Sequence, residues 1–337
     1  MGNEPITGNA DSGHSLTRRR ALLGAAGTAF AGLAGCITRG EDSGLEGEIR
    51  IDGSNTLLPN SALVSELFMW DNNQVRISVS GSGTGAGFQQ FCRDETDLQN
   101  ASREISDDEQ SQCAENDVDW LELDVVMDGI AIIKHPDNTW CDELTVDELN
   151  QLWGRGSDID TWADLDDDWP DEEISFYGRD AASGTYDYFT EQINGAVGNI
   201  RDDYSGSPDT NNIVRGVRGN EHAIGFAGAG YYEENSDDLE LIEVYNGNEY
   251  VAPTDESIQA AEDEEGMDDV EPYLPLSRPM YLYVRTPALE RPAFREFVRF
   301  YLENTQETAS DVGFYPVPDA TIDEQREELE AAIEEHA

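Results

Sequence analysis

The segment EIRIDGSNTLLPNSALVSELFMWDNNQVRISVSGSGTGAGFQQF, from Glu48 to Phe91, decides the fold class of this chain. Its first part predicts a strand that ends in a Gly-Ser-Asn-Thr turn, followed by an amphipathic helix. A second strand then runs into a glycine-rich loop, and another helix starts near Thr84. This β-α-β-α alternation is typical of an α/β fold, in which helices cover a mostly parallel sheet.

The alternation continues along the rest of the chain. We expect further strands within residues 96–105, 121–136, 174–180, 223–232 and 278–285, and helices within 144–153, 183–194 and 291–304. The length of 337 residues and the hydrophobic content of 38% suffice for two lobes with cores of their own. The sequence therefore predicts two α/β lobes joined by strands.

The charge of the chain is extreme. It carries 72 acidic residues against 20 basic ones, a formal net charge of -52, and Lys134 is its single lysine. Such a surface repels nucleic acid and anionic lipid, so we expect neither as a partner. The spread of acid over the whole chain resembles proteins of halophilic archaea, whose surface charges are screened by molar salt.

The N-terminal region predicts export. Three arginines, Arg18 to Arg20, precede a short apolar run that ends in Leu-Ala-Gly-Cys36. The pattern resembles a twin-arginine signal followed by a lipobox, which makes Cys36 the lipid attachment point on the outer face of the cell membrane. An ordinary secretory signal with an incidental cysteine is the alternative. Removal of residues 1–35, which carry one net positive charge, leaves the mature chain at -53.

Apart from Cys36, the chain has three cysteines and four histidines, and these limit its disulfide and metal chemistry. Cys92 and Cys113 flank one predicted helix-and-loop segment and make the plausible disulfide, which leaves Cys141 as a buried thiol. Two of the four histidines, His14 and His336, fall in expected tails, so a zinc-type site lacks ligands. We expect neither a metal nor a cofactor.

Four strand-to-helix junctions carry small polar residues that suit an anion. Backbone N–H groups at helix N-termini favour negative charge, and ligands of open α/β sheets lie beyond the carboxyl ends of the strands. A glycine-rich turn alone often serves only to make a tight bend, but here four junctions converge. They supply Ser54, Asn55 and Thr56; Ser82 and Thr84; Asp97; and Arg179, Ser183, Gly184 and Thr185.

These segments resemble a known family. GSNTLLP, SGSGTGAGFQQFC, TDLQNASR, YGRDAASGTYDYFTE, GNEHAIGFAGAGYYEEN, PLSRPMYLYV and VGFYPVP are similar, in order, to segments of the phosphate-binding proteins of ABC transporters. The resemblance runs from about Glu48 to Pro318. It implies a type II periplasmic-binding-protein fold whose two lobes close on one phosphate at the hinge. We expect lobe 1 to comprise residues 47–130 and 275–337, lobe 2 residues 131–274, and a tether residues 36–46.

The resemblance also implies a set of binding residues. Donors carry over to Thr56, the backbone at Leu57, Thr84, Arg179, Ser183, Gly184 and Thr185, with Asp97 as acceptor and Ser54, Ser82 and Ser102 beside them. Some relatives brace this arginine with an Asp two residues later; this chain has Ala181 there, with Asp180 adjacent. Asp97 would accept the proton of phosphate and so reject fully ionised sulfate.

Three functions are compared on this basis. A hydrolase is disfavoured because RDAASGT lacks the Gly-x-Ser-x-Gly pattern and no histidine lies in a base motif. A binder of tungstate or molybdate, or a surface phosphate sensor, is the alternative to transport. The leading hypothesis is a monomeric binding protein that captures inorganic phosphate and delivers it to the permease subunits of a phosphate ABC transporter.

Overall fold

The computed structural model describes residues 44–233, 235–262 and 270–336, and these residues belong to one compact unit. The predicted export signal and Cys36 lie outside the described residues. Within these ranges the strands form one 11-stranded mixed sheet. The strands are β1 (Gly47–Gly53), β2 (Val75–Val79), β3 (Leu98–Ala101), β4 (Trp120–Lys134), β5 (Glu143–Leu144), β6 (Ser175–Arg179), β7 (Ser205–Ser207), β8 (Ala223–Gly228), β9 (Glu240–Tyr245), β10 (Tyr250–Val251) and β11 (Ser277–Arg285).

The helices alternate with these strands. They are α1 (Leu58–Asp71), α2 (Thr84–Phe91), α3 (Asp107–Glu115), α4 (Val146–Trp153), α5 (Trp162–Leu165), α6 (Gly184–Asn194), α7 (Thr210–Arg218), α8 (Gly230–Glu233), α9 (Asp255–Gln259), α10 (Pro292–Asp311) and α11 (Asp319–His336), with 3-10 turns η2 (Ala260–Glu262) and η3 (Thr286–Glu290). Several start at a side-chain cap. Ser106 with Glu109, and Thr145 with Glu148, form capping boxes on α3 and α4.

The long strand β4 joins the two lobes. The sheet order is β2-β1-β3-β11-β4-β8-β6-β7, and β9 also pairs with β4. Residues Trp120–Gly129 of β4 pair with β11, whereas Ile130–Lys134 pair with β8 and β9. We call the half around β1, β2, β3 and β11 lobe 1, and the half around β6, β7, β8 and β9 lobe 2. The pairing partner of β4 therefore changes between Gly129 and Ile130.

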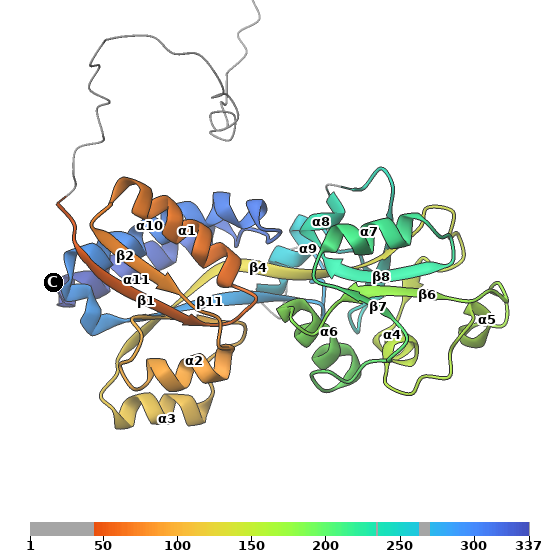
Figure 1. The fold of residues 1–337 in the computed structure, drawn as a ribbon, viewed down its shortest axis with the longest axis horizontal. Helices are drawn as coiled ribbons and strands as arrows, with labels where there is room; N and C mark the ends of the chain where they lie inside the picture. Colours follow the sequence, from red (N-terminus) through yellow and green to blue (C-terminus); the bar gives the residue numbers. More distant parts are fainter. Residues whose placement is uncertain (1–43, 234, 263–269, 337) are drawn as a thin grey trace, which may run out of the picture. The chain divides into compact units, whose positions relative to one another are not determined.

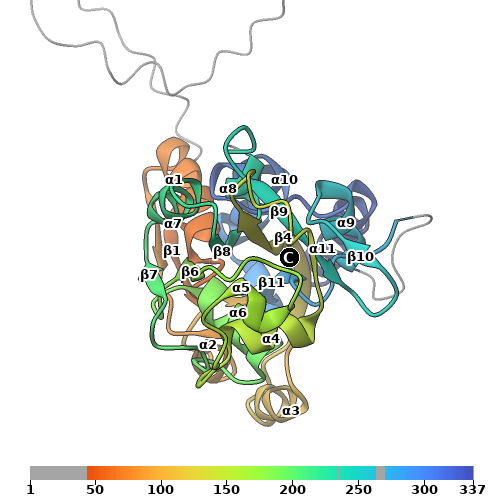
Figure 2. The ribbon, with the colours of Figure 1, turned by 90° about the vertical axis from the view of Figure 1, so that its right-hand side faces the viewer.

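Helices cover both faces of the sheet in each lobe. In lobe 1, α1 and α10 lie on one face and α2 and α3 on the other, as Figures 1 and 2 show from two directions. Phe68 of α1 packs edge-on against Phe297 and Phe300 of α10. The strands β1, β2 and β3 are parallel, so their carboxyl ends point to the same edge, toward lobe 2.

Most expected elements are present, and the two-lobed α/β fold is confirmed. The C-terminal region is different from the expectation, because residues 319–336 form the helix α11 rather than a tail. Its sequence is so acidic that the apolar stripe is sparse. Ile322, Leu329 and Ile333 nevertheless lie at helical spacing and are all buried.

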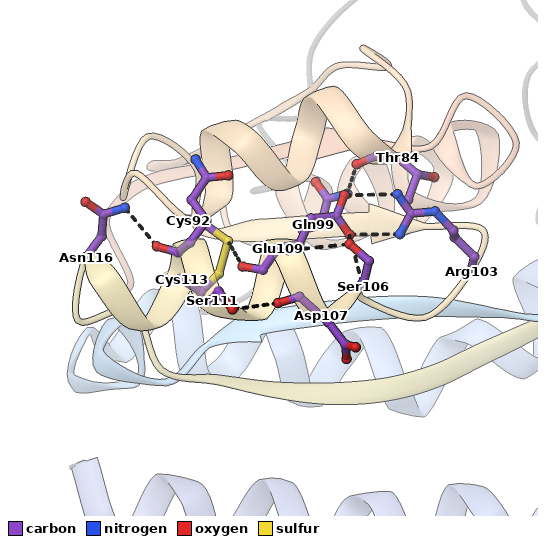
Figure 3. The surroundings of a disulfide bond; sticks show 11 residues. Thr84, Cys92, Gln99, Arg103, Ser106, Asp107, Glu109, Ser111, Cys113 and Asn116 are labelled. Atoms are coloured by element: carbon purple, nitrogen blue, oxygen red, sulfur yellow. Dashed lines mark hydrogen bonds and ion pairs between the residues drawn. A yellow bond between two sulfur atoms is a disulfide. The ribbon is translucent and has the colours of Figure 1, made fainter.

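A disulfide ties α2 to α3. Cys92, which directly follows α2, is bonded to Cys113 of α3, and Figure 3 shows this pair beside the N-terminal capping box of α3. This is the pairing expected from sequence. Cys141 is a free thiol and is fully buried, and its burial raises the pKa well above the ordinary thiol range. A buried neutral thiol of this kind is chemically inert.

Candidate functional site: a cleft between the lobes

Two adjoining cavities, together called the cleft, lie where the strands β1, β2, β3 and β6 end. Their volumes are about 170 and 270 Å³, which is below the range of roughly 300–1,000 Å³ typical of sites for drug-sized ligands. Each cavity alone is therefore sized for a small ligand. Ser54, Asn55, Thr56, Gly83, Thr84, Ser102, Gly184, Asp187, Tyr188, Glu191, Val197 and Arg278 line the first cavity. Asn55, Thr56, Pro59, Asp128, Arg179, Ala182, Ser183, Gly184, Thr185, Thr210, Gly228, Tyr231, Val312, Gly313 and Phe314 line the second.

Three helices begin at the cleft without a side-chain cap. The residues before α1, α2 and α6 are Leu57, Gly83 and Ser183, and none of their side chains accepts a hydrogen bond from the helix. By contrast, α3, α4, α7 and α9 all start at a side chain that caps a backbone N–H. The first N–H groups of a helix have no partner within the helix. The cleft therefore collects free backbone donors and the positive ends of three helix dipoles.

The two lobes approach each other closely at these helix starts. A methyl group built on Gly184, at the start of α6, would overlap the hydroxyl of Thr56 in the turn before α1. Glycine at this position therefore lets the junction of lobe 2 reach the junction of lobe 1.

Arg179 is braced by two hydroxyl groups. Its Nε donates to Ser183 Oγ at 3.1 Å, and its Nη1 donates to Thr210 Oγ1 at 2.6 Å. Asp180 instead accepts from the backbone of Ala182 and shapes the turn. None of the described residues accepts from Nη2, so this nitrogen remains available to a ligand. Thr210, at the start of α7, takes the bracing role that Ala181 cannot fill.

Lobe 1 contributes a second pair of hydroxyl groups. Thr84 Oγ1 and Ser102 Oγ are 2.9 Å apart, and the Ser102 backbone N–H also donates to Thr84 Oγ1 at 3.2 Å. The side chain of Gln99 donates to the carbonyl oxygen of Thr84 at 3.0 Å, which fixes the start of α2 (Figure 3). Ser54 Oγ accepts from the Thr56 backbone at 3.2 Å. These hydrogen bonds fix the positions of the three hydroxyl groups at the rim of the first cavity.

Several predicted residues line the cleft and others do not. The cleft brings together Ser54, Thr56, Thr84, Ser102, Arg179, Ser183, Gly184 and Thr185. Ser82 is absent from both linings, and its backbone donates to Asp52 at 2.9 Å instead. The Leu57 side chain is fully buried away from the cleft.

The prediction for Asp97 is wrong in its geometry. Asp97 lies before β3, at the amino end of the strand, whereas the cleft lies at the carboxyl end. Its carboxylate accepts from the Arg50 backbone at 2.8 Å, from Arg285 Nη2 at 3.1 Å and from Arg291 Nη2 at 2.7 Å. All of these partners belong to lobe 1 and none lines the cleft. Asp97 therefore stabilises the end of lobe 1 that lies away from the cleft.

The carboxylate that does line the cleft floor is Asp128 of β4. Its side chain is 4% exposed, and its Oδ2 accepts from Arg278 Nη2 at 3.3 Å. Burial raises the pKa of Asp128, and the Arg278 guanidinium opposes that rise. The sequence contains a signal for this site that our reading missed. Asp128 is a single charged residue inside the otherwise apolar run Val125–Ile133.

Two further carboxylates, Asp187 and Glu191, line the first cavity from α6. Burial raises the pKa of Asp187, with Arg278 opposing the rise and Glu191 adding to it. Two arginines, Arg179 and Arg278, thus face three carboxylates across the cleft. Such a mixture suits an anion that can both accept and donate hydrogen bonds.

The fold and the cleft first define a class of protein. A family model described as a PBP superfamily domain matches residues 38–305, and lobes joined by a shared strand around a polar cleft agree with it. The chain belongs to this superfamily, and within it to the family of the phosphate-binding protein PstS.

The relatives that carry this assignment match most of the chain. Protein SphX of Synechocystis is 38% identical over 274 residues, which are 80% of this chain and 79% of SphX. Phosphate-binding protein PstS of Staphylococcus saprophyticus is 35% identical over 295 residues, 87% of this chain and 88% of PstS. A solved "possible phosphate binding protein" from Planctomyces limnophilus is 35% identical with a TM-score of 0.78, over 86% of this chain and 99% of its own.

Membership also bears on catalysis. The family consists of transport binding proteins without enzymatic activity, so the expectation that this chain is not an enzyme is confirmed. Among the described residues, no group of three His, Cys, Asp or Glu side chains is arranged to hold a metal ion. None of the helices in the described ranges is both long and apolar enough to cross a bilayer.

Proposed function

We propose that this chain captures inorganic phosphate in the cleft and delivers it to the permease subunits of a phosphate ABC transporter. The observation that carries the proposal is that three uncapped helix N-termini, from both lobes, open onto the cleft, and those of α1 and α6 line the same cavity as Arg179. Backbone N–H groups and a guanidinium fork are the donors that bind tetrahedral oxyanions best. The names of the relative PstS and of the Planctomyces protein, which both state phosphate binding, point the same way.

The proposed ligand shell follows the lining of the cleft. Phosphate oxygens accept from the backbone at Leu57 and Gly184 and from the Arg179 guanidinium. The hydroxyl groups that complete the shell are those of Thr56, Thr84, Ser183 and Thr185, with Ser54 and Ser102 beside them. Asp128 replaces Asp97 as the carboxylate that accepts the phosphate proton. None of the described residues donates to Asp128 Oδ1, so that oxygen is available to the ligand.

Asp128 gives a physical reason for phosphate over other oxyanions. Phosphate near neutral pH still carries a proton, whereas sulfate, tungstate and molybdate have none to donate. A fully ionised anion would face the buried carboxylate without a hydrogen bond, which costs several kcal/mol, or about a thousandfold in affinity. Asp128 therefore favours phosphate over tungstate and molybdate.

The proposal also covers the cellular location of the protein and its oligomeric state. The Arg18–Arg20 cluster and Leu-Ala-Gly-Cys36 support export by a twin-arginine route and lipid attachment at Cys36. The acidic composition supports a halophilic source, in which molar salt screens the surface. We propose that the mature protein acts as a monomer at the outer face of the membrane.

Titration calorimetry of the mature chain in molar KCl tests the function. We expect phosphate to bind and sulfate and tungstate to bind about a thousandfold more weakly or not at all. Arg179→Lys keeps the charge but loses the planar fork, so phosphate affinity should fall by about 1.5–3 kcal/mol. Asp128→Asn should raise sulfate affinity relative to phosphate.

The matched control is Arg218→Lys on α7, whose side chain is 49% exposed and paired with Asp238. Its phosphate affinity should equal that of the wild type. Tighter binding of tungstate than of phosphate by the wild type would contradict the assignment, and an unchanged affinity in Arg179→Lys would remove that residue from the ligand shell.

A further inference from the structure

Arg278 is the point at which both lobes and the strand that joins them meet. From β11, its Nη1 donates to the carbonyl oxygen of Ser102 in lobe 1 at 3.0 Å, and its Nη2 donates to Asp128 of β4. The guanidinium carbon lies 3.7 Å from the ring centre of Tyr188, on α6 of lobe 2. A single side chain thus contacts three separate parts of the cleft wall.

Tyr188 is itself fixed to the segment that carries Arg278. Its hydroxyl group donates to the carbonyl oxygens of Pro275 and Ser277 at 2.7 and 2.9 Å. The ring that supports the guanidinium is therefore held from its far end by the start of β11. Arginine stacks on an aromatic face in this way with a preference that lysine does not share.

Burial is the largest influence on the pKa of Asp128, and the Arg278 guanidinium acts against it. Arg278 is the charged partner of this carboxylate, and Tyr188, Asp187 and Glu191 of α6 face the same guanidinium. Burial pushes the Asp128 pKa upward and Arg278 pulls it down. Without the guanidinium, the buried carboxyl group would hold its proton to higher pH and would donate a hydrogen bond rather than accept one.

We propose that Arg278 is a positioning residue for anion selection, which holds Asp128 toward the cleft as a hydrogen-bond acceptor while it fixes Ser102 and Tyr188 on either side. The proposal rests on the proposed function, because it requires an oxyanion in the cleft. Arg278 acts through Asp128, in contrast to Arg179, which is assigned to the ligand itself.

The pH dependence of sulfate binding tests this role, because sulfate is ionised throughout the range. Sulfate should bind only when Asp128 is protonated, and so only below the pKa of that group. Arg278→Gln raises this pKa, so the pH midpoint for sulfate binding should move upward by about one to three units. Near neutral pH, the ratio of phosphate to sulfate affinity should fall roughly tenfold or more. Calorimetry of the mature chain in molar KCl gives both quantities.

Three controls separate positioning from general stability. Arg278→Lys keeps the positive charge, so its midpoint should stay near that of the wild type, while phosphate affinity falls because an ammonium lacks the fork. In the double variant Arg278→Gln with Asp128→Asn, the midpoint should disappear. Arg218→Gln removes an equal charge from the exposed face of α7 and should change neither quantity.

The outcomes are distinguishable. A folded Arg278→Gln variant with the wild-type midpoint and affinity ratio would overturn the inference, because a purely structural arginine lowers the affinity for both anions together. If the Arg278→Gln variant does not fold, the Arg278→Lys variant tests the inference instead. Unchanged phosphate affinity in Arg278→Lys would overturn the inference. A wild-type protein that binds no phosphate would refute the proposed function instead.

Discussion

At the scale of single residues, Asp97 is a buried carboxylate that is neutralised by arginines. Its side chain is 1% exposed and contacts Arg285 and Arg291, which come from a segment nearly 200 positions later in the sequence. A buried carboxylate is tolerated only when it is paired and hydrogen-bonded. The two arginines supply the opposite charge and the hydrogen bonds, and they connect the start of β3 to the end of β11.

Asp97→Asn should therefore affect stability rather than ligand choice. Removal of one partner from a buried ionic network typically costs about 3–5 kcal/mol, so we expect a loss of unfolding free energy of about 3 kcal/mol. The ratio of phosphate to sulfate affinity should remain that of the wild type. Urea unfolding and calorimetry in molar KCl measure the two quantities.

Asp94→Asn is the matched comparison, because Asp94 also pairs with Arg285 but its side chain is 59% exposed. Exposed pairs contribute about 0–1 kcal/mol, so the loss should be correspondingly small. A changed anion preference in Asp97→Asn with intact stability would return Asp97 to the ligand shell.

At the scale of elements, the cleft depends on the approach of α6 to the turn before α1. Gly184 and Thr56 face each other across the lobes with no room for a methyl group. Both helices start there without a side-chain cap. The approach lets donors of both lobes contact one small anion at the same time.

Gly184→Ala should separate binding from folding. The added methyl group must push the lobes apart, so we expect phosphate affinity to fall roughly tenfold or more, the equivalent of about 1.4 kcal/mol. Alanine is a better helix former than glycine, so the melting temperature without ligand should change little. Calorimetry and thermal unfolding in molar KCl measure both effects. Wild-type affinity in this variant would mean that the lobes do not close at Gly184.

At the scale of the whole molecule, the protein combines an extreme net charge with a local preference for anions. The ligand contacts donors at about 3 Å, whereas surface carboxylates act across solvent. In molar salt the Debye length is only about 3 Å, so distant charges are screened and adjacent donors are not. The cleft can therefore attract an anion in a protein of charge -52.

The same balance predicts folding that depends on salt and ligand. Lowering the salt to about 0.1 M lengthens the Debye length to about 10 Å, so acidic clusters repel one another and the fold should loosen. Phosphate that binds only the native state should stabilise it by about 2.7 kcal/mol at 100 times its dissociation constant. Circular dichroism over a salt series, with and without phosphate, measures both effects. Identical curves with phosphate but a shift with sulfate or tungstate would indicate a different ligand.

Local patterns in the sequence were sufficient for the fold class, and they predicted most of the proposed donors that line the cleft. Alternating strands and helices predicted the lobes because periodicity is a property of neighbouring residues. Arg179 ends a strand, and Thr56, Thr84 and Ser183 lie in the turns or helix starts after strands, so chain order alone predicted them at one edge of the sheet. The helix α11 escaped this reading because its surface acids outnumber its buried apolar residues.

Only the tertiary structure decided which carboxylate and which supporting residues the cleft has. Asp97 precedes β3 and Asp128 lies within β4, and the direction and pairing of these strands put Asp97 at the far end of lobe 1 and Asp128 on the cleft floor. Thr210 reaches Arg179, and Arg278 reaches Ser102 and Tyr188, across long separations in sequence. Contacts of this kind depend on how the strands are ordered in the sheet, which no local pattern of residues encodes.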